Sequence, residues 1–394
     1  MRELLERERA LWAERTPGSE RMFGRARGSL AAGVASSYQR LDPWPVYMTR
    51  GEGARVWDVD GNEYIDFHNG FSAMVQGHAH PAITAAVSAR QPLGTHFGAP
   101  TEEAVVVAEE LSRRFGLSRW RFTNSGTESV MHAIRVARAH TGRDGVVKIA
   151  GSYHGHADTT MVSVGPEPGA WGAGIPDAIV AQVRAVPFND ADAMAGALAE
   201  ADPACVVMEA ARTNAGIVLP EPGYLEAVRD ATRATGTVLI FDEVKTGLTI
   251  APGGAVERFG VRPDMVTLAK ALGAGLPTGA IGMIEELAAL VEDGRVHQVG
   301  TFNGNPLGMA AARANLLEVL TPAAYEHLER LGERMAAGVG AGAIALGSKG
   351  CVHRGAPDRE RSELIWLWLA NRGIFTTPGR EQEWNVTVAH DEAA

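Results

Sequence analysis

Residues 267 to 277 read Thr267-Leu268-Ala269-Lys270-Ala271-Leu272-Gly273-Ala274-Gly275-Leu276-Pro277, an apolar strand-like run that contains one lysine and ends in a glycine-rich turn. A buried ammonium group is costly unless it is paired or loses its charge. A lysine that condenses with an aldehyde as a Schiff base escapes this cost. The alternative is a lysine at a strand end whose head group reaches solvent. This stretch alone leaves both interpretations open.

A carboxylate follows another apolar run upstream. Residues 238 to 244 read Val-Leu-Ile-Phe-Asp-Glu-Val, which predicts a buried strand that ends at Asp242. A buried carboxylate needs a cationic or hydrogen-bonded partner, and a protonated pyridine nitrogen is such a partner. The alternative is an acid that caps a loop or pairs with Lys245. The interval between Asp242 and Lys270 suffices for one helix and a return strand, so both residues can reach the same sheet edge.

A candidate phosphate site lies further upstream. The stretch Phe122-Thr123-Asn124-Ser125-Gly126-Thr127-Glu128 ends a predicted strand and opens a predicted helix that runs to about His140. A helix N-terminus with Ser125, Gly126 and Thr127 offers backbone N–H groups, hydroxyl groups and a favourable dipole to a phosphate. The alternative is that Ser125 or Thr127 only caps the helix.

An aromatic residue follows the next predicted strand, in Ile149-Ala150-Gly151-Ser152-Tyr153-His154-Gly155-His156. Tyr153 or His154 can stack on a flat ring, and the glycines permit a close approach. The alternative is a surface loop whose aromatic residue covers the core. His154 and His156 lie two residues apart without a clear third ligand, so we expect no metal site.

These four features occur together and in the order that a phosphorylated pyridine aldehyde requires, so we expect pyridoxal 5'-phosphate as the cofactor. No Gly-x-Gly-x-x-Gly motif follows the first strand of the predicted parallel region, which disfavours a nucleotide-binding dehydrogenase.

Size and composition are those of a globular protein large enough for two domains, with 394 residues of which 45% are hydrophobic and 21% charged. The net charge of -10 argues against nucleic-acid and anionic-membrane partners. Cys205 and Cys351 are the two cysteines, too few for a disulfide framework. The first nine residues are densely charged and lack the apolar core of a signal peptide. We therefore expect a cytoplasmic protein that acts on small molecules.

The pattern of the chain predicts an α/β fold with two domains. Helices alternate with short apolar strands from about Thr101, which favours a mainly parallel sheet covered on both faces. An amphipathic helix is expected over residues 3 to 15, and a β-hairpin at Asp60-Gly61. We expect residues 71–305 to form a large cofactor-binding domain, and residues 1–70 and 306–394 a smaller α+β domain. The predicted strands of the large domain are Trp120 to Thr123, Val146 to Ala150, Ala204 to Glu209, Val238 to Asp242, Met265 to Ala269 and Ala280 to Met283.

The sequence also resembles the class III aminotransferases of pyridoxal-phosphate fold type I, most closely the group of glutamate-1-semialdehyde 2,1-aminomutases. The resemblance covers nearly the whole chain. It is carried by Trp57-Asp58-Val59-Asp60-Gly61-Asn62-Glu63-Tyr64-Ile65-Asp66, by Gly77-His78-Ala79-His80-Pro81 and by Thr301-Phe302-Asn303-Gly304-Asn305-Pro306. The resemblance implies the pyridoxal-phosphate fold type I. It also implies a homodimer that acts on a small-molecule amino donor and a small-molecule amino acceptor.

The resemblance also implies roles for particular residues. Lys270 would form the Schiff base and then act as the general acid–base, and Asp242 would keep the pyridine nitrogen protonated. Ser125, Gly126 and Thr127 would bind the phosphate, together with Thr301 from the partner subunit. Tyr153 and Val244 would cover the two ring faces. Glu209 would lie near the ring.

Substrate recognition departs from the family pattern. Gln39 stands where the family carries an arginine that is expected to bind a substrate carboxylate, and Arg40 follows it. Phe71 lies where the family has a Trp-Gly-Pro segment. Either Arg40 replaces the missing arginine or the substrate differs, so Arg40 and Phe71 are the candidate substrate-binding residues. The C-terminal domain is also expected to be shortened, in the stretch after Cys351 and at the end of the chain.

Three functions remain open from the sequence. The first is an aminotransferase that moves an amino group from an amino-acid-like donor to a carbonyl acceptor. The second is an aminomutase of the glutamate-1-semialdehyde type, which shares every residue named above. The third is a non-catalytic homologue that retains the fold and the dimer.

Overall fold

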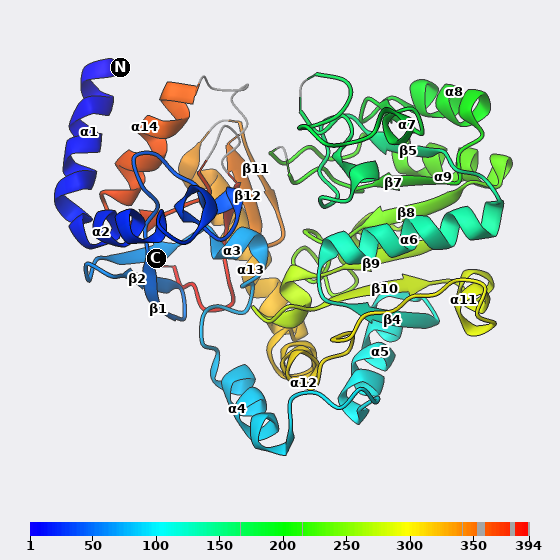
Figure 1. Cartoon of the computed structure of the whole chain (residues 1–394), viewed down its shortest axis with the longest axis horizontal. Helices are drawn as coiled ribbons and strands as arrows, with labels where there is room; N and C mark the ends of the chain where they lie inside the picture. Colours follow the sequence, from blue (N-terminus) through cyan, green and yellow to red (C-terminus); the bar gives the residue numbers. More distant parts are fainter. Residues whose placement is uncertain (166, 215, 341, 353–358, 379–382, 393–394) are drawn as a thin grey trace. The chain divides into compact units, whose positions relative to one another are not determined.

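The computed structural model describes residues 1–165, 167–214, 216–340, 342–352, 359–378 and 383–392 (Figure 1). The chain divides into two compact units: a small unit of Met1–His80 and His327–Ala394, and a large unit of Pro81–Glu326. Both divisions fall later along the chain than the predicted domain boundaries at 70/71 and 305/306. Residues 353–358, part of the stretch that was expected to be short, lie outside the described residues.

A seven-stranded sheet with the strand order β4-β10-β9-β8-β7-β5-β6 forms the centre of the large unit. β6, β5, β7, β8 and β9 are parallel to one another, and β10 is antiparallel to both β4 and β9. β4 therefore runs in the same direction as the parallel strands. The strands are β4 (Arg119–Thr123), β5 (Val146–Ile149), β6 (Val183–Val186), β7 (Cys205–Met208), β8 (Val238–Asp242), β9 (Met265–Leu268) and β10 (Gly279–Met283).

This sheet confirms the predicted mainly parallel arrangement, and six of its strands were expected. β6 was not, because its four residues include an exposed arginine, Arg184, and lack a clear apolar pattern.

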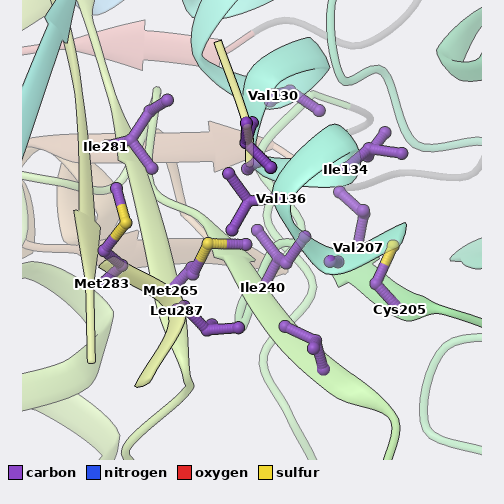
Figure 2. Close-up of a cluster of buried hydrophobic side chains, with 14 of the residues drawn as sticks. Val130, Ile134, Val136, Cys205, Val207, Ile240, Met265, Ile281, Met283 and Leu287 are labelled. Atoms are coloured by element: carbon purple, nitrogen blue, oxygen red, sulfur yellow. The ribbon is translucent and has the colours of Figure 1, made fainter. Parts of the chain in front are cut away.

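Helices pack on the sheet and bury its hydrophobic side chains. The helices of the large unit are α4 (Pro81–Arg90), α5 (Glu102–Phe115), α6 (Gly126–Thr141), α7 (Asp177–Val180), α8 (Ala191–Ala201), α9 (Tyr224–Thr235), α10 (Gly254–Phe259), α11 (Glu285–Glu292) and α12 (Pro306–Ala314). In one cluster, Val130 and Ile134 of α6 and Leu287 of α11 pack with Ile240 and Met265 of the central strands (Figure 2). Full burial of such a side chain contributes about 1.5–3 kcal/mol. The strand ends are thus held on a rigid core.

The small unit contains a four-stranded sheet with the order β1-β2-β3-β13 and a three-stranded sheet with the order β11-β12-β14. β2 (Arg55–Asp58) and β3 (Glu63–Asp66) are antiparallel. Gly61 in their turn has φ +82°, which confirms the predicted hairpin at Asp60-Gly61. The other strands are β1 (Met48–Glu52), β11 (Ala343–Leu346), β12 (Lys349–Val352), β13 (Ile374–Phe375) and β14 (Glu383–Asn385).

The predicted N-terminal amphipathic helix is α1 (Arg2–Arg15), and its apolar side packs on α14 (Arg359–Ala370) of the same chain. The rings of Trp12 and Trp366 meet edge to face, with their centroids 5.1 Å apart. The remaining helices are α2 (Pro17–Ala26), α3 (Asn69–Ser72) and α13 (Pro322–Val339), the last of which begins before the division at 326/327. Among the described helices, none has both the length and the apolar composition that crossing a bilayer requires.

Candidate active site

Five predicted site residues follow the ends of strands that run in one direction, so they lie along one edge of the large sheet. They are Ser125 after β4, Tyr153 after β5, Glu209 after β7, Asp242 at the end of β8 and Lys270 after β9. The strand register supports this arrangement, because Thr123 pairs with Gly279 and Leu268 pairs with Ala280 of the same strand, β10.

The N-terminus of α6 is fixed to the end of β9. Ser129 Oγ lies 2.7 Å from Thr123 Oγ1 and 3.2 Å from the carbonyl oxygen of Leu268. Ser125 is the N-cap, and its Oγ accepts a hydrogen bond from the N–H of Glu128 at 3.2 Å. This helix start therefore lies close to the turn that carries Lys270.

Two donors remain available at this helix start. The backbone N–H groups of Gly126 and Thr127 form no hydrogen bond with any described part of the chain. N–H groups in the first turn of a helix have no partner within the helix and point toward a position where an anion is favoured. The capping role of Ser125 and the predicted phosphate role of Gly126 and Thr127 are therefore compatible.

Two glycines let neighbouring elements approach this helix start. A Cβ atom on Gly126 would lie 2.8 Å from Val244 Cγ1, and one on Gly155 would lie 2.6 Å from Thr127 Oγ1. Gly155 also has φ +93°, which disfavours any other residue. Thr127 Oγ1 in turn lies 3.1 Å from His156 Nδ1. The loop after β5 is thus seated directly on the start of α6.

Asp242 is buried and is held by three donors. Its Oδ1 accepts hydrogen bonds from the N–H of Val244 at 3.0 Å and from Thr267 Oγ1 at 3.2 Å. Its Oδ2 lies 2.7 Å from His154 Nδ1. His154 is also buried, and its Nε2 has no partner among the described residues. Lys245, the alternative partner considered from the sequence, donates from its Nζ to the carbonyl oxygen of Thr213 at 2.6 Å.

His154 is the residue whose role the sequence did not reveal. The sequence placed it beside Tyr153 as a possible ring neighbour, whereas its ring nitrogen Nδ1 contacts the Asp242 carboxylate at the end of β8. β7 lies between β5 and β8 in the sheet. Nothing in the local pattern around residue 154 shows that its side chain reaches across a strand to Asp242.

Glu243, the next residue after Asp242, has a different environment. Its carboxyl group accepts from Thr246 Oγ1 at 2.5 Å and from the N–H groups of Ala255 and Val256 at 3.0 Å. Burial raises its pKa to about 7, against the opposing effect of these donors. Glu243 therefore holds the start of α10, and Asp242 is the carboxylate at the site.

Glu209 and its neighbours connect the end of β7 to the loop that carries Tyr153. Glu209 accepts hydrogen bonds from the backbone and side chain of Thr213 and from the side chain of Asn214. Asn214 Nδ2 also donates to the carbonyl oxygen of Tyr153 at 3.3 Å. The sequence did not single out Asn214, which is exposed and therefore has no burial pattern to mark it.

Lys270 lies in a turn, directly after the predicted strand Met265 to Ala269. β9 ends at Leu268, and Lys270 is the first residue of the short helical turn η5 (Lys270–Gly273). It is half-buried and has φ +46°, a left-handed conformation that is uncommon for a residue with a side chain. Backbone strain of this kind costs about 1–3 kcal/mol and is concentrated at functional sites. The observed strand is one residue shorter than predicted, because sheet pairing stops at Leu268, before the turn begins.

Thr301 is exposed and lies in a loop that reaches the phosphate candidates. Asn303 Oδ1 of this loop accepts a hydrogen bond from Asn124 Nδ2 at 3.0 Å. Four exposed hydrophobic residues, Leu93, Phe97, Val299 and Phe302, which we call the 93–302 patch, lie on this loop and on the adjoining segment 91–98, and each is 51% to 72% exposed. The two segments touch, since Asn305 Nδ2 donates to the carbonyl oxygen of Thr95 at 3.0 Å.

The two substrate candidates belong to the small unit. Phe71 has φ +58°, and its ring contacts Tyr38 with centroids 5.6 Å apart. Arg40 is exposed. Gln39 Oε1 accepts hydrogen bonds from the N–H groups of Ala35 and Ser36 at 3.1 and 3.2 Å, so Gln39 stabilises its own loop. The structure therefore brings the segment of Arg40 next to Phe71 through Tyr38.

Comparison with known proteins places this arrangement in a family. The family model described as Aminotransferase class-III matches residues 37–341. Glutamate-1-semialdehyde 2,1-aminomutase of Sorangium cellulosum is 38% identical over 96% of this chain and 94% of its own length. The chain therefore belongs to the class III aminotransferases.

Solved structures agree with this assignment. An omega-transaminase from Sphaerobacter thermophilus superimposes with a TM-score of 0.91 at 33% identity, over 97% of this chain and 95% of the other. A glutamate-1-semialdehyde-aminomutase from Pseudomonas aeruginosa PAO1 in complex with PMP superimposes with a TM-score of 0.92 at 30% identity, over 100% and 94%. These matches confirm the predicted family, the fold type I architecture and a pyridoxal-phosphate-dependent enzyme.

Proposed function

We propose that the chain moves an amino group from an amino-acid-like donor to a carbonyl acceptor, with Lys270 and Asp242 as its catalytic residues. The observation that carries the proposal is the convergence, at one sheet edge, of a strained lysine, a buried carboxylate and a helix start with two available N–H groups. This donor set fits pyridoxal 5'-phosphate, which needs an amine, an acceptor for its ring proton and a phosphate site.

The roles follow from the chemistry of each group. When bound, the cofactor supplies an aldehyde for the amino group and a ring that takes up electron density. Lys270 Nζ would hold it covalently at rest and, once the substrate amine has displaced the lysine, would remove a proton from the amine-bearing carbon of the substrate. Asp242 would accept the ring N–H, and Ser125, Gly126 and Thr127 would bind the phosphate. Tyr153 and Val244 cover the ring faces, and Glu209 with Asn214 keeps the Tyr153 loop in place.

We propose in addition that the active form is a homodimer, in which Thr301 of one subunit completes the phosphate site of the other. The exposed 93–302 patch supports an interface at this loop, because several exposed apolar side chains on two touching segments favour association. The low number of cysteines, two, fits a cytoplasmic setting.

Substrate binding is proposed to involve Arg40 and Phe71. Gln39 uses its Oε1 as an acceptor within its own loop, and its neutral amide cannot supply the charged, bidentate donor pair of an arginine. A carboxylate contact in this segment then requires Arg40. An apolar group of the substrate would in turn contact the ring of Phe71.

A screen of amino donors tests the proposal. The purified protein, loaded with pyridoxal 5'-phosphate, is mixed with a panel of amino acids and amines, and absorbance follows conversion of the aldehyde form of the cofactor to its amine form. The expected result is conversion by at least one donor. Borohydride reduction should attach the cofactor to the peptide that contains Lys270, and Lys270→Ala should abolish this adduct. A reducible adduct that persists in Lys270→Ala would contradict the assignment.

The second candidate function is an aminomutase, which the names of the curated relatives favour. In an aminomutase the donor and the acceptor carbons belong to the same molecule, so no separate acceptor is needed. Turnover measured with and without an added keto acid distinguishes the two functions. Strict dependence on the keto acid excludes the mutase, and turnover of an amino aldehyde alone excludes the transferase.

A further inference from the structure

Lysine is rare in this chain, and most of its lysine side chains are buried. Only four of the 37 lysine and arginine residues are lysines, at positions 148, 245, 270 and 349. Apart from Lys270, each of them is at most 9% exposed. Arginine and lysine differ in donor geometry, so an interior lysine in a chain rich in arginine indicates a requirement that a guanidinium does not meet.

The side chain of Lys148 joins three backbone carbonyl groups. Its Nζ donates to the carbonyl oxygen of Ser152 at 2.7 Å, of Val162 at 2.8 Å and of Thr160 at 3.3 Å. An ammonium group has three N–H donors on one atom, which matches three converging acceptors. The donors of a guanidinium lie in one plane on three separate nitrogens, and they cannot converge on such a set.

Burial of this lysine is costly, which argues for a positional role. Lys148 lies on β5, where every residue is buried. Desolvation lowers its pKa from the ordinary value of 10.5 to about 8, although the charge of Glu209 acts in the opposite direction. At neutral pH the group is still mainly protonated and can use all three donors. A hydrophobic residue would avoid this cost but would leave three buried carbonyl groups without their donor.

The segment that Lys148 closes carries two groups of the active site. Ser152 and Val162 mark its two ends, and Tyr153 and His154 lie between them. Other contacts also hold this loop: Gly151 N–H donates to the carbonyl oxygen of Ser163 at 2.8 Å, and Thr160 Oγ1 donates to that of Gly155 at 2.9 Å. Lys148 differs from these contacts because its single ammonium group binds three carbonyl groups of the loop, those of Ser152, Thr160 and Val162.

We propose that Lys148 is a positioning residue that closes residues 152–162 into a rigid loop, and that this closure fixes Tyr153 for ring stacking and His154 for its hydrogen bond to Asp242. The effect on the cofactor rests on the proposed function. The closure of the loop does not depend on it, because every contact involved belongs to the chain.

Hydrogen–deuterium exchange of the protein without added cofactor tests the closure directly. In Lys148→Met, which preserves length and removes the donors, the amides of residues 151–163 should exchange about tenfold faster or more. Lys349→Met is the matched control, because Lys349 is equally buried and bonds to side chains of the small unit. It should leave exchange in 151–163 unchanged. Equal exchange in Lys148→Met and wild type, or equal acceleration in both variants, overturns the proposal.

The cofactor provides the second readout. Retention of pyridoxal 5'-phosphate during dialysis should weaken about tenfold in Lys148→Met, with an altered circular dichroism of the bound chromophore. If wild type binds no cofactor, the proposed function fails while the exchange result still decides the closure. If Lys148→Met does not fold, 15N-lysine NMR of the wild type decides instead. A slowly exchanging ammonium signal for Lys148 supports the closure, and rapid exchange with solvent contradicts it.

Discussion

His154 Nδ1 lies 2.7 Å from Asp242 Oδ2, with both side chains buried. A hydrogen bond to a buried carboxylate stabilises its charged form. The charged form of Asp242 is what a protonated pyridine nitrogen requires. His154 thus holds the Oδ2 atom of Asp242, while Val244 and Thr267 hold its Oδ1 atom.

Replacing His154 by Phe should weaken this support. We expect the donor half-reaction to slow about tenfold or more, because a hydrogen bond to a charged group is lost. The absorbance spectrum of the bound cofactor should also change, since the protonation of its ring depends on Asp242. Stopped-flow absorbance measures both effects. His132→Asn is the control, because His132 is another buried histidine, on α6, and its Nδ1 is hydrogen-bonded to Arg135. An identical spectrum and rate in His154→Phe would contradict the assigned role.

Gly155→Ala should separate the loop after β5 from the start of α6. The new Cβ would meet Thr127 Oγ1 at 2.6 Å and Thr127 Cα at 2.7 Å, and the residue would keep φ near +93°. We expect a loss of about 1–3 kcal/mol in the free energy of unfolding and weaker retention of the cofactor. Gly142→Ala is the matched control, because Gly142 has φ +70° but nothing within 4 Å of the added atom. That variant should lose stability through backbone strain alone and keep its cofactor affinity.

Mixed dimers can show whether Thr301 acts across a subunit interface. Thr301→Ala should lower cofactor affinity about tenfold through loss of one hydrogen bond to the phosphate, and Lys270→Ala should be inactive. A dimer that contains one subunit of each variant has one site with both Lys270 and Thr301 intact if Thr301 comes from the partner. Coexpression followed by tandem affinity purification should therefore restore activity at limiting cofactor. If activity stays at the level of Thr301→Ala, Thr301 acts within its own subunit.

Mutation of the 93–302 patch tests the dimer itself. Val299→Asp places a charge on an exposed apolar residue and should shift the protein toward monomer in analytical ultracentrifugation. Leu30→Asp, at an exposed leucine of the small unit, is the control and should leave the sedimentation unchanged. Unchanged sedimentation of Val299→Asp would place the interface elsewhere.

Acid stability should depend on His390. Burial lowers its pKa from the ordinary value of 6.5 to about 4, and its Nδ1 accepts a hydrogen bond from the N–H of Thr387 at 3.0 Å, which protonation would break. As the pH falls from 6.5 to 4 the unfolded chain binds this proton before the folded chain does. The contribution of His390 to the free energy of unfolding is therefore fully present above pH 6.5 and declines by about 3 kcal/mol as the pH falls toward 4.

Urea unfolding at pH 7 and pH 5 measures this effect. His390→Asn keeps an acceptor at this position but does not titrate in the range. It should therefore show a smaller loss of stability than wild type between the two pH values. Equal losses in both proteins would mean that other groups cause the acid sensitivity.

The sequence by itself determined the type of fold and the order of the chemical groups along it. The apolar strands and the polar residues that follow them are local patterns, and Asp242 and Lys270 stand out because charged groups in apolar runs need partners. The hairpin at Asp60-Gly61 was equally predictable, since a tight turn has strict local requirements.

Only the tertiary structure decided which groups meet. The pairing of His154 with Asp242 spans β7, and the three bonds of Lys148 join carbonyl groups that have no side-chain signature in the sequence. The position of Lys270 in a turn beyond β9 depends on where sheet pairing ends. Local patterns predict which residues need a partner, because burying a charged or polar side chain costs free energy wherever it lies in the fold. The identity of the partner depends on strand order and loop path, which the whole chain sets together.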